Sequence, residues 1–378
     1  MGINLIGNTG LFWNCAEQKI ESITRLHSFL TCSMRNTVFV MLALVFYCAY
    51  GGNLLAQEVF TLSHDGLERT YLLDVPDADT EGLPLVLVLH AYVSSANIIR
   101  GYSGWTNVAE NGEAVICYPQ GTSDDLGVNH WNANLGISDT DDIGFLSLLV
   151  ETLQEQYGLS ATCTFVCGMS NGGFMSYTLA CERPDLFRAI GSVAGNMSAY
   201  DQVNCNPGAA LPTIHLHGTL DPTVSYNQGV ILDGPWSGGW GVEDVMAYWT
   251  GLMGTTEMVE EAIPNTVLLD LSTVDFIRHF GALGGQEFHH YRVNGGLHDW
   301  FGAWGNQDID STELIWEFFS AACEQSTNSI ASEIPSSQVA KKVVRIMDLM
   351  GRTTEIEPNR LQLYLYSDGS VEKRIQLH

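Results

Sequence analysis

The chain has 378 residues, enough for one large core and a small appendage, and it carries 43 Asp and Glu residues against 16 Lys and Arg. The formal net charge is −27, and residues 57–340 are the acidic part because they contain six arginines and no lysine. Such a negative field repels nucleic acid and anionic membranes, which argues against both as partners. A solvated surface suited to saline or extracellular conditions explains the charge without a ligand.

Residues 34–56 have the layout of a secretory signal peptide. Arg35 precedes an apolar run at 38–50, and small and polar residues follow it. This run is short for a bilayer span, so we predict a cleaved signal rather than a permanent membrane anchor. Residues 1–33 fit no signal pattern, which suggests a start-site artefact with translation beginning at Met34.

Strand-like and helix-like segments alternate through residues 57–323, which we predict to form one domain. The middle strand candidates are nearly continuous apolar runs, which is typical of parallel strands covered on both faces. The first two candidates form a hairpin pattern, so we predict an α/β fold with a mostly parallel central sheet and helices on both faces. The predicted strands are 58–63, 70–75, 85–90, 114–118, 164–168, 189–194, 213–217, 274–280 and 287–293, and the predicted helices are 142–157, 173–183, 243–252 and 310–322.

The composition changes after residue 323. Residues 324–340 are rich in Ser and short of bulky apolar side chains, as in a linker. Residues 341–378 alternate apolar and polar side chains around Asp368-Gly369, which predicts a hairpin. We expect a short β-rich tail that is too small to build a large core of its own.

The segment Gly168-Met169-Ser170-Asn171-Gly172 places a serine between two glycines. It falls directly after a predicted strand and directly before a predicted helix, which is the context of a nucleophile elbow. A glycine-rich turn without chemistry is the alternative, but the strand–turn–helix context favours a nucleophile.

A serine hydroxyl needs a base to take its proton, and the base needs an orienting carboxylate. On this architecture the acid and then the histidine follow later strands. Asp221 lies in the loop after strand 213–217, and His298 lies in the loop after strand 287–293. Both loops are expected at the sheet edge that carries Ser170, so we predict Ser170 as nucleophile, Asp221 as acid and His298 as base.

Neighbouring polar residues have simpler explanations. Asp299 is expected to cap a loop, and Asp141-Asp142 are expected to cap a helix. His215 and His217 face the same side of a strand and could bind a metal ion. No third ligand lies nearby in the sequence, so we interpret both as structural and predict no metal site.

An acyl-transfer site also needs backbone N–H groups that stabilise the oxyanion. One is expected from Asn171, at the start of the helix after the nucleophile. The second is expected from the loop after strand 85–90, where Tyr92 is the candidate.

The motifs PLVLVLHAY, CYPQGT, HWNANLG, CGMSNGGFMSYTLACERPDLFRAIGSVAG, HGTLDPTV and GGLHDWFGAWG are spaced over residues 58–322. Together they resemble the secreted polyhydroxybutyrate-depolymerase-type esterases of the α/β-hydrolase superfamily, whose relatives include feruloyl and acetylxylan esterases. The resemblance implies the same triad, Ser170, Asp221 and His298, with Tyr92 and Asn171 as the oxyanion donors.

One position departs from that pattern, and one segment outside it has a resemblance of its own. The family usually has glycine where this chain has Ala91, and an alanine would constrain the loop if its φ were positive. The tail at 341–378 resembles the C-terminal sorting segments of proteins exported by the type IX secretion system of Bacteroidetes-like bacteria. We therefore expect a secreted or cell-surface protein.

Aromatic residues near the predicted catalytic loops indicate a substrate subsite. Tyr92, Trp131 and Trp300 are the candidates, with core packing as the alternative for each. For Trp304 the two interpretations are evenly balanced. The insert at 226–241 contains Gly and Trp and could cover the site.

The sequence thus predicts an exported, monomeric serine esterase that forms an acyl-enzyme and needs no cofactor. Hydroxybutyrate or related hydroxyalkanoate oligomers and polyesters are the first substrate class, and feruloyl or acetyl esters of plant polysaccharide are the second. A non-catalytic surface-binding protein is a third possibility.

Six cysteines follow residue 56, and fifteen pairings are open to them in an exported protein. Two of these thiols should flank the strand that ends at His90, about 9–10 Å apart across it, which is too far for a disulfide. The expected pairs are Cys181–Cys205 and Cys163–Cys323, which leaves Cys117 and Cys167 unpaired.

Overall fold

The computed structural model describes residues 58–208, 210–230, 239–333, 343–347, 361–366 and 371–375. The predicted signal peptide, the segment before it, part of the predicted linker and the middle of the 226–241 insert lie outside these residues. Among the described residues, no helix combines the length and apolar character needed to cross a bilayer.

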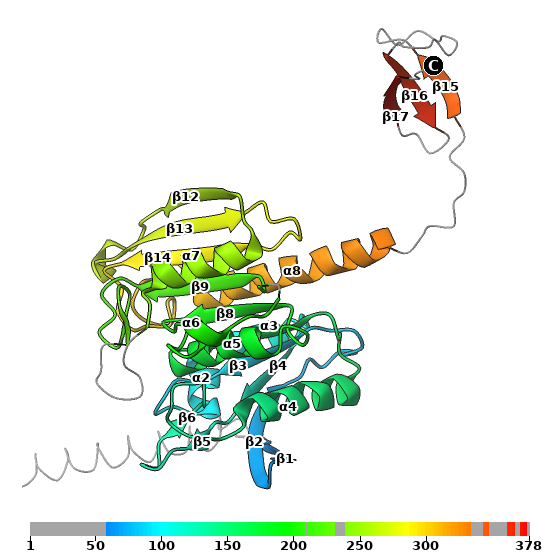
Figure 1. Cartoon of the computed structure of the whole chain (residues 1–378). Helices are drawn as coiled ribbons and strands as arrows, with labels where there is room; N and C mark the ends of the chain where they lie inside the picture. The colour runs from blue at the N-terminus through cyan, green and yellow to red at the C-terminus, as the bar shows by residue number, and fades with distance from the viewer. Residues whose placement is uncertain are drawn as a thin grey trace, which may run out of the picture. The chain divides into compact units, whose positions relative to one another are not determined.

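The main domain is built on a ten-stranded mixed sheet with the order β1-β2-β4-β3-β7-β8-β9-β14-β13-β12 (Figure 1). Its centre, from β4 to β14, is parallel, and antiparallel strands extend it on both sides. The strands are β1 (Phe60–His64), β2 (Leu67–Asp74), β3 (Leu85–Leu89), β4 (Val115–Pro119), β7 (Thr164–Met169), β8 (Ala189–Val193), β9 (Thr213–Gly218), β12 (Glu257–Ile263), β13 (Thr273–Phe280) and β14 (Phe288–Asn294).

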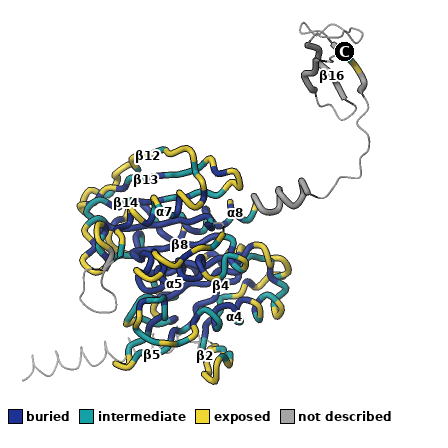
Figure 2. Tube along the Cα trace, viewed as in Figure 1, coloured by how far each residue is buried: buried dark blue, intermediate teal, exposed yellow. Residues whose placement is uncertain are grey.

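Helices pack on both faces of this sheet. Side chains alternate along β3, so Leu85, Leu87 and Leu89 join one core cluster whereas Val86 and Val88 join the other. The first cluster includes helices α4 (Asp142–Tyr157), α5 (Asn171–Glu182) and α7 (Val242–Met253), and the second includes α2 (Ala96–Ser103), α3 (Trp105–Glu110) and α8 (Ser311–Glu333). The central strands are accordingly dark blue in Figure 2. The predicted α/β architecture is confirmed.

The differences from the prediction include two additional helices, an additional edge strand and a longer final helix. Helices α2 and α3 occupy a stretch in which no helix was predicted, and β12 is an additional strand. Helix α8 continues to Glu333 and so takes in the first part of the predicted linker at 324–340. The physical reason is that residues 324–333 contain neither Pro nor Gly, so nothing ends the helix before Pro335.

Strand β12 forms one edge of the sheet. It pairs with β13 on one side, and the order of strands within the described residues ends with it. Its sequence, EMVEEAI, exposes Glu257, Glu260 and Glu261. This solvated pattern lacks the apolar alternation from which a strand is predicted, which explains why the sequence did not reveal it.

The C-terminal strands form a separate three-stranded antiparallel sheet. Strand β16 (Leu361–Tyr366) pairs with both β15 (Val343–Met347) and β17 (Val371–Ile375). The predicted hairpin is confirmed by the pairing of β16 with β17, although its Asp368-Gly369 turn lies outside the described residues.

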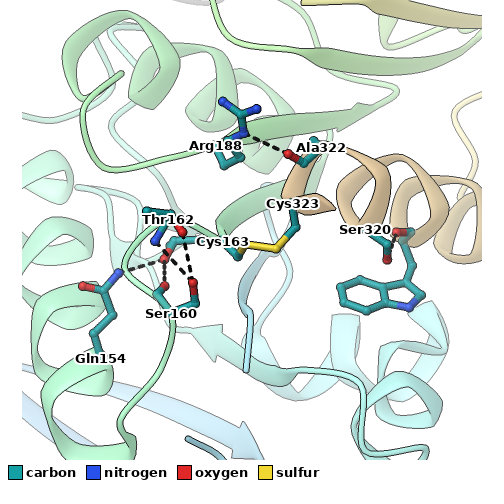
Figure 3. Close-up of a disulfide and its surroundings, with 10 residues drawn as sticks. Gln154, Ser160, Thr162, Cys163, Arg188, Ser320, Ala322 and Cys323 are labelled. Carbon is teal, nitrogen blue, oxygen red and sulfur yellow. Dashed lines mark hydrogen bonds between the residues drawn. A yellow bond between two sulfur atoms is a disulfide. The ribbon is translucent and has the colours of Figure 1, made fainter. Parts of the chain in front are cut away.

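Both predicted disulfides are present. Cys163, just before β7, is bonded to Cys323 on α8 with a Cα–Cα distance of 5.3 Å (Figure 3). Cys181, on α5, is bonded to Cys205 at 5.2 Å. Cys117 and Cys167 are buried free thiols, also as predicted.

Candidate active site

Ser170 stands at a strained turn between β7 and α5. Its φ of 54° and ψ of −117° lie in a region that residues other than glycine rarely occupy. Its backbone N–H donates to the Val193 carbonyl at 2.8 Å, which fixes the turn against β8. This strained strand-to-helix turn is the geometry of a nucleophile elbow, and it places Ser170, which is 7% exposed, at the end of the sheet.

The flanking glycines are required by close approach rather than by their φ values, since neither lies in the left-handed region. A Cβ on Gly168 would lie 2.5 Å from the Gly172 carbonyl carbon. A Cβ on Gly172 would overlap the Leu89 carbonyl oxygen at the end of β3. The glycines thus let the backbones on either side of Ser170 pack together.

Asp221 and His298 form a hydrogen-bonded pair. Their loops follow β9 and β14, and His298 Nδ1 lies 2.7 Å from Asp221 Oδ2. The loops are joined by a hydrogen bond of 2.9 Å from the Leu220 N–H to the Gly296 carbonyl. Because β7, β8, β9 and β14 are mutually parallel, these two residues and Ser170 all follow the carboxyl ends of strands at one edge of the sheet.

The Asp221 carboxylate has a complete set of hydrogen-bond donors. Its Oδ1 accepts from the N–H groups of Thr223 at 2.8 Å and Val224 at 2.9 Å. Burial alone would raise the pKa of Asp221, but the donors His217 and His298 outweigh it and lower that pKa well below its usual value. An ionised Asp221 requires the hydrogen of His298 on Nδ1, which leaves Nε2 able to act as a base.

Asn171 begins α5, where a backbone N–H has no partner within its own helix. Its side chain is held by two reciprocal hydrogen bonds with the Trp131 backbone, of 2.7 and 3.0 Å. Ala91 has a negative φ, and the positive φ of this loop, 64°, falls on Val93 instead. The alanine therefore does not constrain the loop that carries Tyr92, whose hydroxyl donates to Asp124 at 2.7 Å.

The structure corrects the prediction that Trp131 and Trp300 contact substrate. Trp131 is fully buried, and its Nε1 donates to the His90 carbonyl at 3.0 Å. Trp300 is 1% exposed, and its Nε1 donates to Thr312 at 3.2 Å. The sequence placed both residues in loops on the catalytic edge, but their rings are buried in the core.

Trp131 instead braces both candidate oxyanion donors. Its backbone holds the side chain of Asn171, and its indole holds His90, two residues before Tyr92. Trp304, in contrast, is 39% exposed and packs edge-on against the Tyr102 ring, with centroids 4.5 Å apart.

A buried ion pair supports the same region and was not predicted. Arg69 Nη2 lies 2.6 Å from Asp142 Oδ1, and both side chains are inaccessible. The other carboxylate oxygen of Asp142 accepts from the Asn132 N–H at 2.7 Å. Only Asp141 caps the helix, by accepting from the Gly144 N–H at 2.8 Å, so the cap assigned to Asp142 is corrected. Nothing in the sequence links Arg69 to position 142.

Both ring nitrogens of His215 and of His217 are occupied by protein partners. Within the part of the chain that the structure describes, no group of three or more His, Cys, Asp or Glu side chains could hold a metal ion. The two histidines are structural members of the sheet.

The fold is that of the α/β-hydrolases. The solved acetyl xylan esterase from Aspergillus awamori aligns with a TM-score of 0.50 at 15% identity, covering 70% of this chain and 99% of that one. A family model described as "Putative esterase" matches residues 68–249, which include Ser170 and Asp221 but end before His298.

Curated proteins of similar sequence are also described as esterases. The "Putative esterase NocK" of Nocardia uniformis subsp. tsuyamanensis is 27% identical over 44% of this chain and 48% of its own length. The "Probable feruloyl esterase C" of Aspergillus flavus is 27% identical over 44% of this chain and 59% of its own. The chain thus spans about half the length of these relatives, and over that part it is similar to esterases.

Proposed function

We propose that this protein is an exported serine esterase that uses Ser170, His298 and Asp221. The observation that carries the proposal is the strained elbow at Ser170 together with the His298–Asp221 pair at the same edge of the sheet. A backbone conformation this unfavourable persists only where the surrounding structure enforces it, and such strain is concentrated at functional sites. Export is supported by the signal-like segment at 34–56 and by the two disulfides.

The reaction would take place in two halves. His298 Nε2 removes the Ser170 hydroxyl proton as Oγ attacks the ester carbonyl carbon, and the N–H groups of Asn171 and Tyr92 stabilise the oxyanion. The C–O bond to the alcohol breaks, the alcohol leaves with the proton from His298, and an acyl-enzyme remains. Water, deprotonated by His298, then releases the acid and restores Ser170. Asp221 stays ionised throughout and stabilises the transient imidazolium.

Two substrate classes follow from different observations. The similarity to a probable feruloyl esterase C and to an acetyl xylan esterase favours feruloyl or acetyl esters of plant polysaccharide. The motif pattern from PLVLVLHAY to GGLHDWFGAWG favours hydroxybutyrate oligomers or amorphous polyester. The first class takes precedence, since both sequence and structure comparisons contribute to it.

Initial hydrolysis rates on one matched panel test the function. The full chain and its Ser170→Ala variant are compared on methyl ferulate, acetylated xylan, hydroxybutyrate oligomers and amorphous polyhydroxybutyrate. We expect the variant to lose at least about a thousandfold on every ester that the wild type cleaves. A wild type that cleaves none of them, and whose Ser170 resists a fluorophosphonate probe, would contradict the proposal and favour a binding protein.

A further inference from the structure

A buried chain of polar rings lies behind the Asp221 carboxylate. Tyr177 Oη is 2.9 Å from His215 Nδ1, and His215 Nε2 is 3.1 Å from His217 Nδ1. His217 Nε2 lies 2.8 Å from the Val224 carbonyl oxygen and 3.4 Å from Asp221 Oδ2. The three rings have no solvent exposure. The chain therefore joins α5, the helix that begins at the proposed nucleophile, to the loop that carries the proposed acid.

When the rings are neutral, only one assignment of donors and acceptors satisfies this series of hydrogen bonds. His217 Nε2 faces two acceptors, so it carries the hydrogen and its Nδ1 accepts. His215 must then donate from Nε2 and accept at Nδ1 from Tyr177. Burial, reinforced by the neighbouring histidines, lowers the pKa of His215 well below its usual value, and burial raises that of Tyr177, so both stay neutral.

Val224 gives this chain a second route to the acid. Its carbonyl accepts from His217, while its own N–H donates to Asp221 Oδ1 at 2.9 Å. Losing His217 would thus release the loop that fixes one carboxylate oxygen, as well as remove the N–H edge of a ring near the other. The buried Val224 carbonyl would also lose this donor. The free-energy cost of leaving it without one favours a shift of the loop.

His290, on β14, completes the cluster without reaching the acid. Its Nδ1 lies 3.0 Å from the His215 carbonyl oxygen, so it donates there, and its Nε2 accepts from Tyr226 at 2.9 Å. His290 is as buried as His217 but bonds neither Asp221 nor Val224, and it reaches the segment after them only through the Tyr226 hydroxyl, which makes it the matched control. The titratable groups that face His217 are His215, Asp221, Tyr226 and His290, and His298 contacts the same Asp221 carboxylate.

We infer that His217 is a positioning residue for the proposed triad, which holds the Asp221 loop through Val224 and aligns Asp221 Oδ2 with His298. The inference rests on the proposed function only for its effect on catalysis. The arrangement of hydrogens that it requires is a property of the folded protein and can be measured without a substrate.

Long-range ¹H–¹⁵N NMR of the imidazole rings gives that first measurement. In wild-type protein at neutral pH, the ring hydrogen should lie on Nε2 in His215 and His217 and on Nδ1 in His290. Each ring is assigned from the variant in which it is substituted. A His217 ring that carries its hydrogen on Nδ1 alone would overturn the inference whatever the activity, because that tautomer cannot donate to Val224 or Asp221.

Kinetics on p-nitrophenyl acetate then separate positioning from general stability. His217→Leu should lower kcat by about 10- to 100-fold, the cost of a small misplacement of catalytic groups. It should also move the acid limb of the kcat/KM profile to higher pH by about half a unit, because Asp221 with one donor fewer holds the His298 proton more tightly. His217→Gln retains an amide donor and should restore most of both properties.

The control decides between the two roles. His290→Leu should lower the unfolding midpoint as His217→Leu does, but leave kcat within about twofold and the acid limb in place. Equal kinetic losses in both leucine variants, or an unshifted acid limb in His217→Leu, would show that His217 only packs the core. An inactive wild type with the expected tautomers would instead contradict the proposed esterase while leaving the hydrogen-bond chain intact.

Discussion

Replacing Cys163 and Cys323 together by alanine removes the cross-link between β7 and α8. The bond closes a loop of 160 residues, for which the chain-entropy relation gives about 5 kcal/mol of stabilisation at 25 °C. The same relation gives about 3 kcal/mol for Cys181–Cys205, which closes 24 residues. The difference arises because the longer cross-link removes more conformations from the unfolded chain.

The folded state should change little in this variant. The Arg188 Nε donates to the Ala322 carbonyl at 2.9 Å beside the disulfide, so α8 stays attached to the sheet (Figure 3). Cys163 precedes β7, whereas Ser170 follows it, so the cross-link and the nucleophile lie at opposite ends of the strand. We therefore expect ester hydrolysis by the folded variant to stay within about twofold of the wild type.

Urea unfolding without reductant, followed by tryptophan fluorescence, measures both free energies. The variant without Cys163–Cys323 should lose more than the variant without Cys181–Cys205, by about 2 kcal/mol, and its m-value should rise as the unfolded chain expands. A larger loss from the 24-residue loop would refute the entropic argument. If the variant is fully folded but has lost activity, the expectation that the disulfide does not affect the proposed site is wrong.

Three other properties follow from the described residues. Burial lowers the pKa of His90 to about 4 and that of His290 to about 3, and it lowers the pKa of His215 well below its usual value. Only the unfolded state therefore takes up these protons as the pH falls below 6.5. The free energy of unfolding should drop by about 4 kcal/mol per pH unit near pH 5, and a flat pH dependence in urea titrations would contradict this. Gly172→Ala should destabilise the protein by more than about 3 kcal/mol because of the overlap with Leu89, whereas Gly101→Ala, with open space inside α2, should stabilise it by about 1 kcal/mol in thermal melts. The two unpaired thiols are buried with raised pKa values, so a maleimide should label them only after unfolding, and rapid labelling of native protein would contradict their burial.

Local patterns were sufficient to predict most of the fold. The parallel strands are short apolar runs, and Asp142–Tyr157 has the predicted helix bounds because Asp141 and Gly158 cap it. The order serine, acid, histidine also placed the candidate triad, since each residue follows a strand that the sequence shows clearly. These features depend on residues that are neighbours in the chain.

Features that depend on distant partners could not be predicted in this way. An indole in a loop can face the cleft or the core, and only the His90 carbonyl, 41 positions from Trp131, shows which way it turns. The Arg69–Asp142 pair likewise joins residues 73 positions apart. The sequence showed the two histidines of β9, but their link to Asp221 depends on the bend of the loop that brings Val224 and Asp221 to His217.

The glutamates of β12 have a consequence for how the protein survives acid. An unpaired strand edge can join the edge of a second molecule, and closely spaced negative charges oppose that contact. Acid removes the negative charge of carboxylates, so this protection is lost while the buried histidines also weaken the fold. Acid exposure should therefore end in precipitation rather than in a soluble unfolded chain, and recovery on neutralisation should decrease as the protein concentration rises.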